Sequence, residues 1–155
     1  MMENSLRQSG QPFNMSNNSR RILRSNNFMI IASDATNLGK VERLIDGIVE
    51  EHKIPSSLYG NILISVTEAV TNAITHGNAK DLSKDVSISF RVNENKLSFK
   101  IQDEGYGFDY ENIPDPTAPE NILNLGGRGI FLMKQLSDGV AFENNGSVVE
   151  IFFNI

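Results

Sequence analysis

The order of the elements along the chain predicts an α+β fold, a two-layer sandwich in which helices cover one face of a mixed, mostly antiparallel sheet. Apolar side chains recur at helical spacing between residues 38 and 77 and alternate with polar ones between 86 and 101. Further on, Asn145-Gly146 joins two apolar segments, as in a β-hairpin. The resulting order is β-α-α-β-β-loop-α-β-β, and we find no internal repeat.

The first half of the fold is predicted to be one strand followed by two helices. Residues 28–32 form a short apolar run typical of a strand, and 33–36 offer N-cap side chains for a helix that continues to about Lys53. Pro55 and the two serines after it predict a second helix over about 56–77. Its apolar stripe consists of Ile62, Val66, Ala69, Val70 and Ala73, and its opposite side carries Ser65, Glu68, Asn72 and His76.

The second half is predicted to be a strand pair, a long loop, a helix and a hairpin. Polar and apolar residues alternate from Val86 to Val92 and again from Leu97 to Ile101, with a turn between them. The loop 109–125 contains three prolines, and loops of this length in a compact domain are usually functional or disordered. A helix with Ile130, Phe131, Met133 and Leu136 then follows Gly129, and two strands follow at about 139–144 and 147–154.

Composition excludes several classes of protein. Of the 155 residues 39% are apolar and 21% charged, which is ordinary for one soluble domain, and the absence of cysteine excludes disulfides and thiolate metal sites. We expect a cytoplasmic protein, because no apolar run is long enough for a membrane span and no signal peptide begins the chain.

Charge divides the chain into two predicted parts. Residues 1–26 are polar, with four arginines against one glutamate, and are predicted to be a flexible arm with a net charge of +3. The segment 20–24 could dock on a partner or a membrane surface, although a solvated tail is the simpler interpretation. Since the total is −5, the predicted domain 27–155 carries −8, which argues against direct nucleic-acid binding.

A first candidate motif lies on the second helix. Glu68, Asn72 and His76 are spaced by four residues, so they share one helix face. A carboxylate and an amide oxygen on one face can position Mg²⁺ and a nucleophile, because hard cations take oxygen ligands. The alternative is an ordinary solvated face, with His76 and Gly77 serving only the end of the helix.

A second candidate motif is the turn that begins at Asp103. Asp103 continues the parity of the inward residues Phe99 and Ile101, so its carboxylate should face the covered side and need a donor. The donor could be the exocyclic amine of a purine or a backbone N–H of the turn. Gly105 and Gly107 would leave room for a flat ring, or would simply permit the turn.

A third candidate motif opens the last helix. Free N–H groups at a helix N-terminus attract anions, and Gly126, Gly127 and Gly129 would let backbone approach phosphates, with Arg128 adding a positive charge. The alternative is a tight turn with Arg128 in solvent. The loop 109–125 between the two glycine motifs would form a lid over the nucleotide.

Together the three motifs resemble those of the GHKL superfamily of ATP-binding domains, with a Bergerat-type fold, over about residues 27–155. The closest resemblance is to the anti-sigma-factor serine/threonine kinases: 68–78 is similar to their N box, 103–109 to the first glycine box and 126–133 to the second. The resemblance implies ATP and Mg²⁺ as cofactors. It implies that Asn72 holds the metal, Glu68 is the general base, Asp103 accepts from adenine, Gly105 and Gly107 line the adenine end, and Gly127, Arg128 and Gly129 meet the phosphates.

The resemblance also implies a biological role. The protein would phosphorylate a STAS-type anti-sigma-factor antagonist in a partner-switching pathway, could hold a sigma factor in turn, and could form a homodimer through the edge strand 28–32. The alternative is an ATP-binding interaction module that sequesters a partner with little phosphotransfer. The ATP-binding half of a histidine kinase is disfavoured, because we expect no dimerisation helix with a phospho-accepting histidine. One departure from the superfamily pattern is Ser147, near the place where a late-strand threonine is common.

Overall fold

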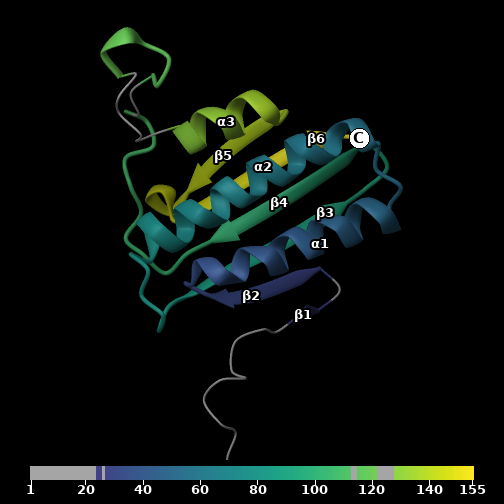
Figure 1. Cartoon of the computed structure of the whole chain (residues 1–155), viewed down its shortest axis with the longest axis horizontal. Helices are drawn as coiled ribbons and strands as arrows, with labels where there is room; N and C mark the ends of the chain where they lie inside the picture. The colour runs from purple at the N-terminus through teal and green to yellow at the C-terminus, as the bar shows by residue number, and fades with distance from the viewer. Residues whose placement is uncertain (1–23, 26, 113–114, 122–127) are drawn as a thin grey trace, which may run out of the picture.

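The computed structural model describes residues 24–25, 27–112, 115–121 and 128–155, which form one sheet with three α-helices on the same face (Figure 1). The strands follow the order β1-β2-β3-β4-β6-β5, and each of the described pairings is antiparallel. The predicted α+β sandwich is therefore confirmed. The strands are β1 (Arg24–Ser25), β2 (Phe28–Ala32), β3 (Asp85–Val92), β4 (Lys96–Gln102), β5 (Gly139–Glu143) and β6 (Val148–Asn154). The α-helices are α1 (Leu38–Glu51), α2 (Ser56–Asn72) and α3 (Arg128–Leu136).

The core lies between the helices and the sheet, as the periodicity predicts. The inward residues of β3 and β4 are at most 5% exposed, and the apolar stripe of α2 packs against them. Burying a large aliphatic or aromatic side chain contributes about 1.5–3 kcal/mol, so this layer is the main source of stability. Its strand members are Val86, Ile88, Phe90, Leu97, Phe99 and Ile101, and its α2 members are Ile62, Val66, Ala69 and Val70.

The sheet begins earlier than the sequence predicts. Arg24 pairs with Met29 and Ser25 with Phe28, so the short strand β1 lies inside the segment 1–26 that was predicted to be a flexible arm. Two residues have no detectable period, which explains why the sequence did not reveal this strand. β1 also covers the first part of the β2 edge that we had considered for a homodimer, and residues 1–23 lie outside the described part.

The end of α2 departs from regular helix. The sequence predicts one helix to about residue 77, whereas Ala73–Gly77 form a wider π-helical turn, η2. Its five-residue bond from Asn78 N to Ala73 O measures 2.8 Å. Such turns are rare in proteins, and those that do occur often lie at functional sites. This turn leads from Asn72 to Gly77, and Gly77 packs against Asp103, which follows β4.

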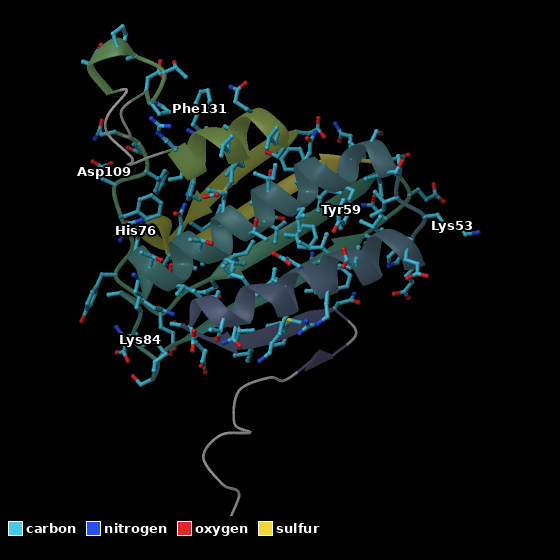
Figure 2. The ribbon with its side chains drawn as sticks, viewed as in Figure 1. Lys53, Tyr59, His76, Lys84, Asp109 and Phe131 are labelled. Carbon is cyan, nitrogen blue, oxygen red and sulfur yellow. The ribbon has the colours of Figure 1, made fainter. Side chains whose placement is uncertain are left out.

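All three candidate motifs lie at one end of the molecule. α2 and α3 run antiparallel, so the C-terminal end of α2 lies beside the start of α3 (Figure 1). In Figure 2, His76 and Asp109 lie at that end, whereas Lys53 marks the opposite end. Among the described residues, no helix is both long and apolar enough to cross a membrane.

Candidate functional site

The third motif packs directly on the first. A β-carbon placed on Gly129 would lie 2.6 Å from Glu68 Oε2 and 3.4 Å from Asn72 Nδ2. The start of α3 therefore rests against the two polar side chains of α2. A β-carbon here would displace the end of the Glu68 side chain.

The second motif meets the end of α2 through two further glycines. A β-carbon on Gly77 would overlap the carboxyl group of Asp103, and one on Gly105 would overlap the carbonyl oxygen of Gly77. Gly77 thus belongs to the site, although the sequence analysis gave it only a helix-ending role. The three motifs that are separate in the sequence are contiguous in space.

Asn72 and Asp103 line a single hollow. Its walls are mostly apolar and come from α2, β4, α3 and the hairpin of β5 and β6. A slot with apolar walls and a few polar groups is typical of sites for flat organic ligands. The lining residues are Ala69, Asn72, Ala73, Gly77, Ile101, Asp103, Phe108, Met133, Phe142, Gly146, Ser147 and Val149.

Asp103 is buried, as its strand parity predicts. Its side chain is 8% exposed, and burial raises its pKa, while the N–H of Gly105 and the charge of Lys84 oppose that shift. Oδ1 accepts from the backbone N–H of Gly105 (2.8 Å), which is the turn interaction that we considered as the alternative. Within the described residues no hydrogen bond reaches Oδ2, so this oxygen can accept from a ligand in the hollow.

The packing of this chain explains why glycine stands at positions 105 and 107, apart from any room that it leaves for a ring. The space beside each is filled by backbone of this chain: Gly77 for Gly105, and the carbonyl of Asn145 for Gly107. Gly107 also has φ +86°, a conformation that favours glycine. Phe108 N donates to Asn145 O (2.7 Å), so the turn is fixed to the β5–β6 hairpin.

The structure describes only part of the third motif and only part of the loop 109–125 that was predicted to be a lid. Arg128 is the first residue of α3 and its side chain is exposed, whereas Gly127 lies outside the described residues. In the lid, hydrogen bonds from Asn112 lower the pKa of Asp109, and those from Thr117 lower the pKa of Asp115. These acids are held by local bonds and lie outside the hollow.

Two residues at the site were not among the predicted site residues. Ser147 lines the hollow, and its carbonyl accepts from Asp103 N (3.0 Å) while its Oγ donates to Asn144 O (3.0 Å). Asn78 is completely buried beside the turn of Asp103. A polar residue directly after a helix-ending glycine was the only available signal for Asn78, and such a residue is usually exposed.

The side chains at the site suit a metal ion that is bound partly by the protein and partly by a ligand. Across the described ranges, no three His, Cys, Asp or Glu side chains gather into a cluster that could hold a metal ion. Asn72 is half-buried and lines the hollow. Its amide oxygen is a ligand type that Mg²⁺ takes alongside phosphate oxygens. These residues therefore fit a metal that arrives with a phosphate-bearing ligand.

Comparisons with known proteins agree with this geometry. Residues 31–153 match the family model described as a histidine kinase-like ATPase domain. The chain is 31% identical over 117 residues to the serine-protein kinase RsbW of Bacillus subtilis (strain 168), covering 72% of this chain and 73% of that protein. It is 29% identical over 126 residues to the RsbW of Bacillus velezensis (77% and 79% covered), and 38% identical over 92 residues to that of Staphylococcus aureus strain MRSA252 (55% and 58%).

Proposed function

Because the chain belongs to the histidine kinase-like ATPase family, we propose that it is an ATP-dependent protein serine/threonine kinase that phosphorylates a STAS-type anti-sigma-factor antagonist. The single observation that carries the proposal is the meeting of three motifs at one hollow. Glu68 and Asn72 touch the start of α3, and Asn72 shares the hollow with Asp103. A kinase needs a general base, a phosphate-binding site and a binding site for the purine close to one another.

The adenine end of the site is the apolar slot. Asp103 Oδ2 accepts from the exocyclic amine, while Oδ1 stays with the N–H of Gly105. Walls such as Met133 and Phe142 exclude water from the ring. A charged acceptor in such surroundings discriminates strongly, because a buried carboxylate without its donor is costly.

The phosphate end is the junction of α2 and α3. The N-terminus of a helix favours anions, and Arg128 stands at the N-terminus of α3. Asn72 supplies an oxygen ligand for Mg²⁺, which when bound neutralises charge on the phosphates. Gly127 and Gly129 are proposed to meet the phosphates from the same turn.

Glu68 is the proposed base. Its carboxylate lies at the start of α3, where the terminal phosphate is proposed to bind. The serine or threonine hydroxyl of the partner attacks the γ-phosphorus, the bond to the ADP oxygen breaks, and the hydroxyl proton passes to Glu68. A base at hydrogen-bond reach of the nucleophile contributes about 10²–10⁴-fold in rate.

The proposal includes the regulatory role of an anti-sigma-type protein. Phosphorylation of the antagonist decides whether the kinase holds that protein or a sigma factor, and such a switch requires a segment with two states. We infer a cytoplasmic protein that can form a homodimer and makes no direct contact with nucleic acid or membrane.

The experiment is phosphate transfer from [γ-³²P]ATP with Mg²⁺ to candidate STAS proteins. We expect label on a partner serine or threonine, its loss in Glu68→Gln, and its retention in Glu42→Gln, an exposed glutamate on α1 that serves as a matched control. ATP binding without label on any partner would instead favour the interaction module. No binding of Mg·ATP or Mg·ADP at all would refute both functions.

A further inference from the structure

One buried amide at the site is not explained by nucleotide contacts. Asn78 is 0% exposed and follows the π-helical turn that ends the Asn72 helix. It does not line the hollow that holds Asn72 and Asp103. A fully buried polar side chain is retained only where its hydrogen bonds are satisfied, so its partners reveal what it holds together.

The side chain of Asn78 links three segments that are distant in the sequence. Nδ2 donates to Ser33 Oγ (2.8 Å), just after β2, and to Asp85 O (2.9 Å), at the start of β3. Oδ1 accepts from Glu104 N (2.7 Å), in the turn after β4. Ser33 is itself fixed, because its Oγ donates to Lys84 O (2.8 Å) and its residue is 1% exposed.

These bonds determine the backbone on both sides of Asp103. The N–H of Asp103 donates to Ser147 O, and the N–H of the next residue, Glu104, donates to Asn78 Oδ1. The Glu104 carboxylate in turn accepts from Asp85 N. With both N–H groups hydrogen-bonded, the backbone at Asp103 is constrained. From this backbone position, the bond from Gly105 N–H to Oδ1 directs the side chain toward the hollow.

We propose that Asn78 is a positioning residue that makes the site selective for a purine with an exocyclic amine, by aiming the carboxylate of Asp103 through the Glu104 N–H. This inference rests on the proposed function and names a determinant of its nucleotide specificity. The same short segment then serves both ends of the nucleotide: Asn72 on the helix serves the phosphates, and Asn78 after the turn serves the base.

A role in stability alone would leave a different signature. If Asn78 only held the fold, its loss would weaken all nucleotides by the same factor. If it aims Asp103, its loss weakens adenine nucleotides and spares those whose base has a carbonyl in place of the amine. ADP and IDP differ in this way and share the ribose and the diphosphate.

The test is calorimetry of the full chain with Mg·ADP and Mg·IDP. We expect the wild type to prefer ADP by about tenfold or more, the scale of a hydrogen bond to a charged group. Asn78→Ala should weaken ADP by about the same factor and IDP by less than about twofold, so the preference approaches one. The matched control is Asn37→Ala, which removes a side-chain bond to Ala32 O (3.0 Å) outside this network and should keep the wild-type preference.

A milder variant keeps the test decisive if Asn78→Ala does not fold. Ser33→Ala removes one acceptor of Nδ2 and leaves Asn78 in place, and it should lower the ADP preference by about threefold. Equal weakening of both nucleotides, or an unchanged preference in a folded variant, would overturn the inference while leaving the kinase proposal intact. A wild type that binds neither nucleotide would overturn both.

Discussion

Gly60, near one end of the molecule, differs from Gly77 and Gly105, at the other end, in what surrounds it. Beside Tyr59, toward the end that Lys53 marks in Figure 2, a β-carbon on Gly60 of α2 would meet nothing within 4 Å. At the other end, β-carbons on Gly77 and Gly105 would overlap a carboxyl group and a carbonyl. Glycine is therefore replaceable at Gly60 and required at Gly77 and Gly105, where direct approach of neighbouring segments shapes the site.

The strongest test of this difference is Gly105→Ala. The new methyl group would collide with backbone of Gly77, which cannot rotate away as a side chain can. We expect a loss of about 3 kcal/mol in the free energy of unfolding, at the upper end for single substitutions. Nucleotide binding should be lost as well. Urea denaturation and calorimetry measure both, and an unchanged midpoint would contradict the packing that we describe.

Gly129→Ala should separate catalysis from folding. Its methyl group would meet the end of the Glu68 side chain, which can move, so we expect the unfolding free energy to change by less than about 1 kcal/mol. Phosphate transfer should fall by about a hundredfold, because the base is displaced. Steady-state kinetics with a phosphorylatable partner measures this.

Gly39→Ala is the matched control for Gly129→Ala. Gly39 is the second residue of α1, as Gly129 is of α3, and the nearest atom to its β-carbon would be Arg43 NH1 at 3.9 Å. Transfer should be unaffected. A similar loss of activity in both variants would mean that helix propensity, not the position of Glu68, controls the rate.

Asp103 is buried and Asp109 is exposed, and their contributions to stability should depend on pH in opposite directions. Burial raises the pKa of Asp103 in the folded state, so the folded protein holds that proton more tightly than the unfolded chain does. Its contribution to stability therefore falls as pH rises from the ordinary aspartate value through the raised one. The pKa of Asp109 is lowered by Asn112, so its contribution is present above the ordinary value and is lost as pH falls.

Urea denaturation between pH 3 and 7 tests these opposite signs. The difference in unfolding free energy between wild type and Asp103→Asn should decrease with rising pH. The corresponding difference for Asp109→Asn should increase, and only slightly, because Asp109 is exposed. The same sign for both variants would contradict the assignment of burial as the dominant effect on Asp103.

The smallest expected effect is a gain. Gly60→Ala adds a methyl group in open space on an exposed helix position, where alanine is favoured over glycine by about 0.5–1 kcal/mol. Thermal unfolding should show a higher midpoint, with nucleotide binding unchanged. A destabilised Gly60→Ala would mean that α2 is more tightly packed at this end than the structure shows.

Periodicity made much of this fold and part of its site predictable. The alternation along β4 correctly placed Asp103 on the covered side, and the spacing of Glu68 and Asn72 correctly placed them on one face. The π-helical turn and the role of Asn78 were not predictable, because both depend on partners such as Ser33 that only the folded chain brings near. The glycines of the motifs were identified from the sequence. The backbone segments that pack against them, such as Gly77 against Gly105 and Asn145 against Gly107, were not.

The bond from Asp103 to Ser147 has a consequence for the order of events during synthesis. The segment with Asp103 leaves the ribosome before the segment with Ser147, so a growing chain lacks the acceptor that orients this aspartate until β6 is added. Nucleotide should therefore engage only the finished sheet, and by binding the folded form alone it would draw late intermediates toward completion.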